Sequence, residues 1–571
     1  MIIGEEARRL ILVSALFAAL TFVMAYPFSA SPGSLVLADL PDTHLFIWTL
    51  AWDTHAFLHQ PLLIFDANIY HPYSNTLAYS ENLIGSAFFA APIIWLTGNL
   101  VLAMNLAALL TCVLCGVGAY LLARRWGLSP AAAFLCGVIF AFAPPRFFRL
   151  GQLHMTAVQW IPFTLAFLHT YLEHGLSTQD APSTAHPSLK TGRRRDLLLA
   201  IACFSLQVLS SGHGAAFLAV AIVLLFAWRV AFGQPIAIRQ WLKDCGATGA
   251  YLLAPSIWVL LPYRAAQVEA GLRREYPEDS MPRLASFLAS PSRVHEYLQG
   301  VVLGRTINDE AVAFLFPGIL AILLAVLAMV TWRPVRARLR ADPTGYFALL
   351  ALVSTLMFVT WPIETWRYVH WLPGFNFIRV PSRFILLLML CLAVLGAAAF
   401  DRLTVRRSVR ARLVAAAVLS TLLLAEYTSY PFAGVPYALE IPPIDRWLNT
   451  LPKPFAIAEV PVPSPGHLGQ HERHHTTAML HATAHWQKTV HGYSGIRRPL
   501  HHELYLKLTD FPEPATIAAL REVGVTHVVV HTDQYSSRDQ WRVVDAQLAS
   551  SPDLELLHSE GDGRVYALRP R

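Results

Sequence analysis

Long apolar runs separated by short polar segments make up most of the first 430 residues. A helix needs about 20 mostly apolar residues to cross the hydrocarbon layer of a membrane. A transmembrane β-barrel would instead show short segments of alternating polarity. The pattern therefore predicts a mainly α-helical, polytopic membrane protein with about eleven spans, at residues 10–30, 101–123, 130–145, 156–172, 197–211, 214–230, 245–262, 311–332, 344–361, 384–400 and 411–430.

Two apolar segments need separate treatment. The run from Leu10 to Phe28 is long and lacks a small-residue cleavage site, so we interpret it as a signal anchor. The run from Ile84 to Trp95 contains Pro92, and counting it as a span would reverse every later loop. We therefore predict an interfacial or re-entrant helix there.

Composition and charge agree with this topology. The chain has 571 residues, of which 55% are hydrophobic and only 14% charged, whereas a soluble domain is nearer 25% charged. No lysine or arginine occurs between Leu10 and Ala123. The net charge of +7 comes largely from alternate loops, which indicates cytoplasmic loops rather than nucleic-acid binding. These basic loops are 124–129, 173–196, 231–244, 333–343 and 401–410.

With those loops inside, two large elements lie outside, as expected for a protein of the bacterial inner (cytoplasmic) membrane. The first is the loop 31–100, where the spacing of Phe46, Trp48, Leu50 and Trp52 predicts a short amphipathic helix at the headgroup level. The second is the tail. We thus expect a transmembrane domain, 1–430, and a C-terminal extracytoplasmic α/β domain, 431–571.

The tail shows strand and helix patterns in alternation. Residues 456–462 and 525–531 are rich in β-branched residues, which is typical of strands. Residues 514–523, which end before a glycine, and residues 541–548 are predicted to be helices.

Five carboxylates fall in the outer stretch that lacks cations, and Asp39 and Asp42 stand just beyond the first span. Such groups suit a general base, or hard oxygen ligands for a divalent cation such as Mg²⁺ or Mn²⁺. The alternative is that they are solvated loop acids and a helix cap, because Pro41-Asp42-Thr43 is a typical helix start.

Arginines at the ends of outer loops form the second candidate group. They run against the usual cytoplasmic bias of basic residues, and guanidinium groups bind phosphate in a bidentate manner. They are therefore candidates for holding a lipid-linked phosphate, the alternative being lipid headgroup contact or pairing with nearby acids. These residues are Arg146, Arg149, Arg264, Arg379 and Arg383.

Histidines are unusually dense between His467 and His502, and His471-Glu-Arg-His-His lies among them. The spacing matches no standard zinc pattern, so a structural or acceptor-binding role and a metal site both stay open. Further polar residues of the outer segments are candidates for a substrate pocket, each with the alternative of being an ordinary hydrogen-bonding residue: His71, Glu81, His154, Gln159 and His213.

Several segments together resemble the GT-C superfamily of membrane glycosyltransferases, and within it the YfhO-like bacterial membrane proteins. The resemblance rests on the segments beginning Asp42-Thr-His-Leu-Phe, Pro61-Leu-Leu-Ile-Phe-Asp, Ala78-Tyr-Ser-Glu-Asn, Ala141-Phe-Ala-Pro-Pro-Arg, Gly151-Gln-Leu-His, Arg379-Val-Pro-Ser-Arg-Phe, Thr483-Ala-His-Trp and Gly524-Val-Thr-His.

This resemblance implies an enzyme that moves a sugar from a polyprenyl-phosphate donor to a glycan, lipid or protein acceptor on the extracytoplasmic side. Asp42 matches the position of the acidic base after the first span, although Leu40-Pro41 separate it from Asp39, so either acid remains a candidate. A lipid or glycan transporter or flippase, and a non-catalytic lipid-binding assembly factor of the cell envelope, are the alternatives. The spans carry few charges, which favours an enzyme at the membrane surface over a transporter.

Overall fold

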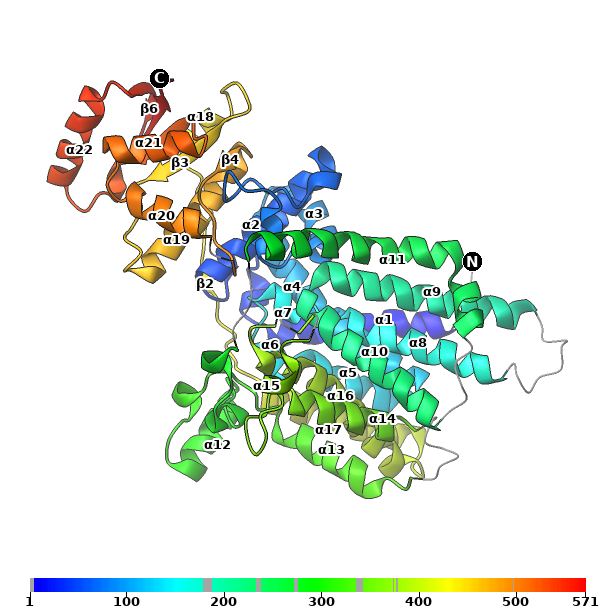
Figure 1. Cartoon of the computed structure of the whole chain (residues 1–571). Helices are drawn as coiled ribbons and strands as arrows, with labels where there is room; N and C mark the ends of the chain where they lie inside the picture. Colours follow the sequence, from blue (N-terminus) through cyan, green and yellow to red (C-terminus); the bar gives the residue numbers. More distant parts are fainter. Residues whose placement is uncertain are drawn as a thin grey trace. The chain divides into compact units, whose positions relative to one another are not determined.

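The computed structural model describes residues 5–177, 187–232, 238–271, 276–334, 342–372, 374–375, 378–496 and 498–570. Its contacts divide the chain into two compact units (Figure 1). We call residues 1–32, 105–259 and 273–434 the helical unit, and residues 33–104, 260–272 and 435–571 the sheet unit. Each is described separately below.

Each of the eleven predicted spans overlaps one of the eleven longer helices named below, and two of the spans also reach into a short α-helix. Five of the described helices are long and apolar enough to cross a membrane by length and composition, which supports a polytopic membrane protein, while the total number of spans stays a prediction. The helices are α1 (Glu5–Met24), α4 (Leu100–Arg125), α5 (Pro130–Phe142), α8 (Trp160–Ser177), α9 (Pro187–Ser210), α10 (Gly212–Phe232), α11 (Ile238–Glu269), α13 (Ile319–Thr331), α14 (Pro343–Leu356), α16 (Ile385–Thr404) and α17 (Val409–Tyr427).

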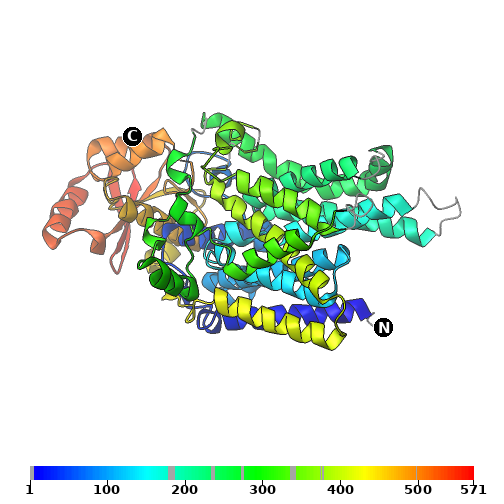
Figure 2. The same cartoon turned by 90° about the horizontal axis from the view of Figure 1, so that it is seen from below.

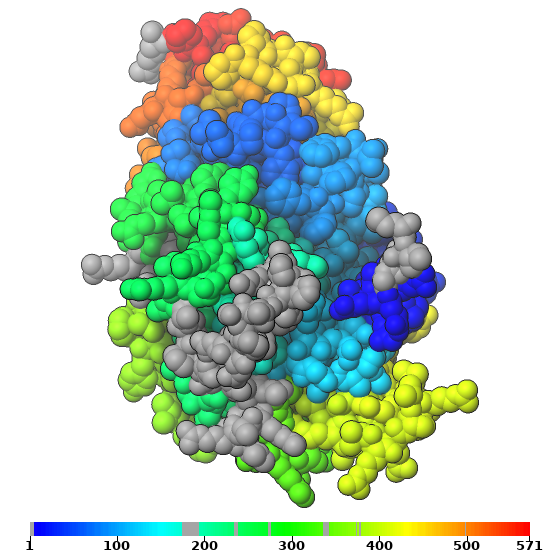
Figure 3. All heavy atoms as spheres, turned by 90° about the vertical axis from the view of Figure 1, so that its right-hand side faces the viewer, coloured from blue at the N-terminus to red at the C-terminus, as the bar shows by residue number. Residues whose placement is uncertain are grey.

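Helix α16 forms the centre of the helical unit. It packs against α5, α13 and α14, and 83% of its apolar window is buried, compared with 17% for α1. An all-apolar helix that is mostly exposed within the protein has a surface suited to lipid. Figure 2 shows α8, α9 and α10 running alongside one another, and Figure 3 shows α1 on the surface in dark blue.

Short helices connect the long ones, and three of them carry candidate site residues. Helix α6 (Pro144–Phe147) follows α5 after one residue, and α7 (Leu153–Thr156) precedes α8. The 3₁₀ turn η8 (Pro381–Phe384) leads directly into α16. The other two short helices of this unit are α12 (Arg293–Leu303) and α15 (Trp366–Val369).

The sheet unit contains a five-stranded mixed sheet in the order β4-β3-β5-β7-β6. Strand β3 pairs in parallel with β4 and β5, and β7 pairs antiparallel with β5 and β6. The predicted strands at 456 and 525 are confirmed as β3 and β5. The strands are β3 (Ala456–Val460), β4 (Lys488–Thr489), β5 (His527–His531), β6 (Leu554–Glu560) and β7 (Gly563–Leu568).

Successive side chains of a strand point to opposite faces of a sheet. Both faces of this sheet are covered, and each carries its own buried core. Val528 and Val530 belong to one core, with residues of the helices at 499–508, 514–522 and 538–550. Ile457 and Val529 belong to the other core, with Ile444 and Leu448 of the helix at 443–448. The predicted helices at 514 and 541 are confirmed as α21 and α22. The helices of the tail are α18 (Pro443–Leu448), α19 (Leu468–His481), α20 (Pro499–Leu508), α21 (Pro514–Glu522) and α22 (Arg538–Ser550).

The segment predicted to be the first outer loop, 31–100, belongs to the sheet unit from residue 33 onwards. Its residues form α2 (Pro41–His59) and α3 (Ile84–Thr97), and a short β1 (Leu35–Val36) pairs with β2 (Val435–Pro436) of the tail. Every residue of α2 from Thr43 to Thr54 is buried. The predicted helix is present, but its amphipathic character is wrong: α2 is buried on all sides from Thr43 to Thr54, in part by α3 and α19.

Candidate functional site

Asp39 and Asp42, the two carboxylates predicted to lie outside the membrane, stand just before and within the first turn of α2. Leu40 is the N-cap residue in an extended conformation, Pro41 occupies the first helical position, and Asp42 follows it in the first turn. Proline suits this position because the first backbone N–H groups have no partner within a helix. An acid in the first turn is stabilised by the positive end of the helix dipole. Local physics therefore explains the helix start, with Leu40 rather than Asp42 as its cap.

Asp39 lies just before this turn and is held by two basic side chains. Arg473 of α19 donates from Nη1 to Oδ2 at 2.7 Å and from Nη2 to the Asp39 carbonyl oxygen at 2.8 Å. His44 Nε2 lies 2.9 Å from Oδ1, and its Nδ1 lies 3.1 Å from Thr476 Oγ1. Partial burial acts to raise the pKa of Asp39, but the hydrogen bonds and charges of Arg473 and His44 outweigh it and leave this pKa below its ordinary value.

Asp42 has a different environment. It is half-buried, and Oδ1 accepts a hydrogen bond of 3.0 Å from the hydroxyl of Tyr493. Tyr493 follows Gly492, where an added Cβ would come within 2.5 Å of the Tyr70 ring. Only glycine permits this close approach. The backbone that presents Tyr493 to Asp42 is thus fixed by packing against the first outer loop.

The arrangement does not suit the divalent cation considered for these acids. Mg²⁺ and Mn²⁺ prefer several carboxylate, carbonyl and water oxygens around them. Both carboxylate oxygens of Asp39 already face nitrogen donors, and one donor is a permanent cation. We therefore derive no step through a metal bound by Asp39 and Asp42.

Three of the dense histidines form a hydrogen-bonded chain. Glu459 N–H donates to His491 Nε2 at 2.7 Å, so the proton of the neutral His491 ring is on Nδ1, which lies 2.9 Å from His475 Nδ1. His475 then donates from Nε2 to His471 Nε2 at 3.1 Å, and His471 Nδ1 donates to the Pro463 carbonyl at 2.8 Å. Burial lowers the pKa of His491 to about 4 and that of His475 well below its ordinary value. Neutral rings satisfy one another here, which supports the structural interpretation of these three.

The other predicted residues of the sheet unit are spread over several elements. His71 joins the first outer loop to the tail, since its N–H donates to Thr489 O at 2.9 Å and its carbonyl accepts from His501 Nε2 at 3.2 Å. Glu81 is half-buried next to α3, and Arg264 is exposed on α11.

In the helical unit, Arg146 does not fit the predicted phosphate site. It is fully buried. Its guanidinium donates to the Ala141 carbonyl at 2.7 Å, the Thr111 hydroxyl at 2.9 Å and the Thr156 carbonyl at 3.4 Å. These hydrogen bonds from one guanidinium connect α4, α5 and α7. Because its donors are used by protein acceptors, Arg146 is not among the proposed ligand-binding residues.

The structure does bring together three of the predicted residues of this unit. Arg383 Nη1 lies 2.7 Å from His213 Nε2, and the ring of His213 lies 6.0 Å from that of His154, measured between centroids. They come from η8, α10 and α7 respectively. Arg149 is half-buried and donates to Gln152 Oε1 at 3.2 Å, and Arg379 is exposed. Gln159 is buried, and its side-chain oxygen has no hydrogen-bond partner in the described part of the chain.

Sequence reasoning missed the residues that distinguish the two acids. Arg473 lies among the histidines of the tail, which drew attention only as possible metal ligands or acceptor-binding residues. Tyr493 lies in the segment that begins Thr483-Ala-His-Trp, which was singled out only for its family resemblance. A usable signal was available for Arg473, which is the single arginine among the histidines of His471-Glu-Arg-His-His. No spacing rule connects either residue to α2.

Comparison with known proteins gives a distant likeness. No protein-family model matches the chain, and a search of curated proteins gave no match. Among solved structures, ArnT from Cupriavidus metallidurans in the apo state aligns over 100% of both chains with 13% identity and a TM-score of 0.47. The Archaeoglobus fulgidus oligosaccharyltransferase in complex with Zn and sulfate aligns over 91% of this chain and 68% of its own, with 13% identity and a TM-score of 0.43. The S. cerevisiae protein O-mannosyltransferase Pmt1-Pmt2 complex covers 50% of this chain and 37% of its own, with 15% identity and a TM-score of 0.30. At this distance the function has to be argued from the residues of this chain.

Proposed function

We propose that the protein is a membrane glycosyltransferase that moves a sugar from a polyprenyl-phosphate donor to an acceptor hydroxyl on the extracytoplasmic side. The observation that carries the proposal is the unequal environment of the two outer carboxylates. The Asp39 carboxylate is bound by Arg473 and His44. Asp42 is half-buried, and its carboxylate accepts one hydrogen bond, from the phenolic hydroxyl of Tyr493. Paired acids placed in different environments are typical of a site that assigns them different roles.

Asp42 is the proposed base. Its carboxylate takes the proton of the acceptor hydroxyl, and the acceptor oxygen forms a bond to the anomeric carbon of the donor. The bond from that carbon to the phosphate oxygen breaks, and its electron pair leaves with the lipid phosphate. Asp39 is then a positioning residue, because its ion pair with Arg473 anchors the start of α2, where Asp42 stands.

The proposal of an arginine that binds the phosphate of the lipid donor is kept separately for the helical unit. The proposed residue is Arg383, whose Nη1 lies 2.7 Å from His213 Nε2, because a guanidinium binds phosphate in a bidentate manner. Arg149, Arg379 and Arg264 remain proposed contributors to phosphate binding. Arg149 is half-buried and the other two are exposed, so none of these side chains is enclosed by the protein.

Replacing the base tests the proposal. Full-length protein with Asp42→Asn should lose sugar transfer by at least about 100-fold, since a positioned general base contributes roughly 10²–10⁴ to the rate. Release of polyprenyl phosphate from candidate polyprenyl-phosphate sugars measures the reaction. The exposed Asp533→Asn serves as the control for loss of one carboxylate. Transfer by Asp42→Asn at the rate of the unaltered protein would reject the assignment.

A second variant tests donor binding, and two further measurements separate the proposed enzyme from its alternatives. Arg383→Ala should weaken binding of the lipid donor while leaving the protein folded. A flippase would move the donor across vesicles without releasing lipid phosphate, and an assembly factor would bind the donor with no dependence on Asp42. Either result would replace the glycosyltransferase proposal.

A further inference from the structure

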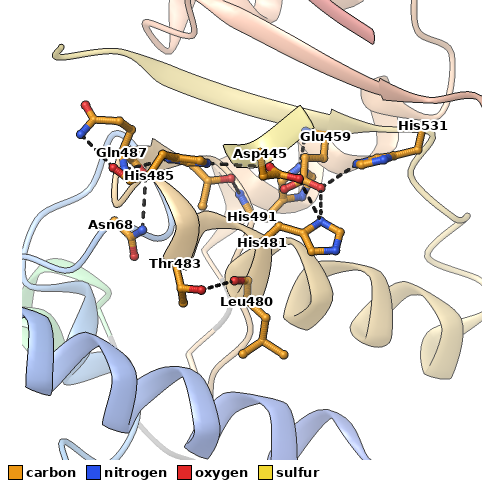
Figure 4. A network of polar contacts seen from close by, with 11 residues as sticks. Asn68, Asp445, Glu459, Leu480, His481, Thr483, His485, Gln487, His491 and His531 are labelled. Carbon is orange, nitrogen blue, oxygen red and sulfur yellow. Dashed lines mark hydrogen bonds and ion pairs between the residues drawn. The ribbon is translucent and has the colours of Figure 1, made fainter. Parts of the chain in front are cut away.

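A second cluster of ligand-type side chains lies in the sheet unit, apart from the histidine chain described above. Glu459 Oε2 lies 2.8 Å from His481 Nδ1 and 2.8 Å from His531 Nε2 (Figure 4). The Asp445 carboxylate approaches the same group, with Oδ2 at 3.9 Å from His481 Nδ1. All four side chains are buried, with exposures between 0% and 6%.

The fold explains why these residues meet. Glu459 lies near the carboxyl end of β3 and His531 at the carboxyl end of the parallel strand β5. Odd-numbered residues of both strands face α18, as Ile457 and Val529 do in the core on that side. Asp445 is on α18 itself, and His481 ends α19. The carboxyl edge of parallel strands is where α/β sheets usually bind ligands.

Several buried polar atoms of this cluster lack partners. Both carboxylate oxygens of Asp445 and Glu459 Oε1 have no hydrogen bond to any described residue. A buried carboxylate is costly unless a donor or a cation satisfies it. Glu459 Oε2 accepts from His481 and His531, and the rings of His481 and His485 approach Asp445 only to 3.9 Å. A cation at the centre of the cluster would satisfy the three remaining oxygens.

We propose that Glu459, His481, His531 and Asp445 bind a divalent transition-metal ion of the Zn²⁺ class. Imidazole nitrogens and carboxylate oxygens bind Zn²⁺ at about 2.0–2.2 Å, commonly with four ligands. Ligand atoms sharing one ion therefore lie within about 4.4 Å of each other. The ligand atoms of Glu459, His481 and His531 all lie within 4.8 Å of one another, so small side-chain shifts suffice.

His485 supports the site without being a ligand. Its Nδ1 accepts a 3.0 Å hydrogen bond from Gln487 N–H, so the proton of the neutral ring is on Nε2, which lies 3.9 Å from Asp445 Oδ1. This distance is too long for a hydrogen bond. A small shift would let the ring donate an outer hydrogen bond to Asp445, of the kind that fixes the orientation of a ligating carboxylate. A cavity of about 240 Å³, lined in part by Glu459 and His481, gives the ion a route to the cluster.

The histidine chain provides an internal contrast. His474, His475 and His491 also have nitrogens within 4.8 Å of one another. Both ring nitrogens of His475 and His491 are used in the directional chain of hydrogen bonds, so a metal would break that chain with no carboxylate among the three candidate ligands. A metal in the cluster around Glu459 also replaces hydrogen bonds, those between Glu459 Oε2 and the rings of His481 and His531, but the carboxylates of Glu459 and Asp445 are there to bind it. The proposal therefore places the ion in the cluster of mixed carboxylates and imidazoles.

Metal content tests the proposal on the full-length, detergent-solubilised protein without a histidine tag. After loading with ZnCl₂ and desalting, elemental analysis should find about one Zn²⁺ per chain, and the thermal unfolding midpoint should rise, because a ligand that binds the folded state stabilises it. Glu459→Gln should retain less than a tenth of the zinc and show no zinc-dependent rise. His502→Gln, which alters an exposed histidine of the same unit, should keep both properties.

Two results would overturn the site. One is unaltered protein that stays folded but retains under a tenth of an equivalent of zinc with no rise in the midpoint. The other is Glu459→Gln retaining as much zinc as the unaltered protein. If Glu459→Gln does not fold, Co²⁺ absorption of the unaltered protein decides: visible bands of a four-coordinate ion support the site, and a spectrum of hydrated Co²⁺ rejects it.

Discussion

Arg473 and Asp39 are 434 positions apart in the sequence, yet they form an ion pair with two hydrogen bonds. One Nη group of Arg473 binds the carboxylate, and the other binds the carbonyl oxygen of the same residue. The pair fixes both the side chain and the backbone of the residue that leads into α2. It therefore connects the histidine-rich helix of the tail to the turn that carries Asp42.

Replacing Arg473 should affect turnover more than stability. Arg473→Ala should lower sugar transfer about 10-fold, because the start of α2 loses its anchor. The free energy of unfolding should change by less than about 1 kcal/mol, since half-exposed ion pairs contribute little. Arg473→Lys keeps the charge but loses the two-pronged contact, so it should fall between the two proteins. Rates equal to that of the unaltered protein would contradict the positioning role.

The Tyr493 hydroxyl offers a finer test of Asp42. Tyr493→Phe removes one hydrogen bond to the carboxylate and should lower kcat about 10-fold with little change in KM, because hydrogen bonds to charged groups contribute about 1.5–3 kcal/mol. Adding Tyr493→Phe to Asp42→Asn should cause almost no further loss, since both act through one carboxylate. Additive losses in the double variant would show that Tyr493 acts on something other than Asp42.

The first outer loop and the tail should be on the same side of the membrane. Residues 33–104 and 435–571 belong to one compact unit, in which Lys488 pairs with Asp66 and β1 pairs with β2. Reporter fusions after residues 60 and 500 should therefore both be active extracytoplasmically. A reporter after Arg407, in a basic loop, should be cytoplasmic. Opposite locations for residues 60 and 500 would refute the topology.

The sequence predicted local structure well and long-range pairing poorly, for physical reasons. Apolar runs located each long helix because burial in lipid or in a bundle imposes the same composition along the whole element. The burial of α2 was missed because Trp48 and Trp52 on one face are equally consistent with a membrane interface and a protein core. Arg473 pairs with Asp39 across 434 positions, and Asp445, Glu459, His481 and His531 come from four separate elements between residues 445 and 531. No local spacing encodes either proximity.

The outer arginines illustrate the same limit. Arg146 and Arg149 are three residues apart and were predicted to act together, yet Arg146 is fully enclosed and Arg149 is not. Arg146→Lys should therefore reduce the folded yield sharply, because a lysine cannot satisfy the carbonyls of Ala141 and Thr156 together with the Thr111 hydroxyl. Leaving a buried acceptor without its donor costs about 1–3 kcal/mol. Arg149→Ala should fold normally, which size-exclusion profiles in detergent will check. Similar profiles for both variants would contradict the distinction.

The buried histidines of the sheet unit should make its stability depend on pH. Burial lowers the pKa of His501 to about 4, although its hydrogen bond to the His71 carbonyl opposes the shift. Between about pH 4 and its unfolded pKa of about 6.5, the unfolded chain binds a proton at this ring and the folded chain does not. Stability is therefore fully present above about pH 6.5 and is lost as the pH falls towards 4.

His501→Gln removes this proton-binding group, and with it the difference in bound protons between the unfolded and folded chains at this position. The slope of the unfolding free energy against pH in that window should fall by up to about 1.4 kcal/mol per pH unit. Hydrogen exchange of amides in β3 and β5, followed by mass spectrometry, measures the unfolding of this unit in the full-length protein. His502→Gln changes the exposed neighbour and should leave the slope unaltered. An unchanged slope in His501→Gln would mean that His501 binds its proton equally in the folded and unfolded states, against the burial observed here.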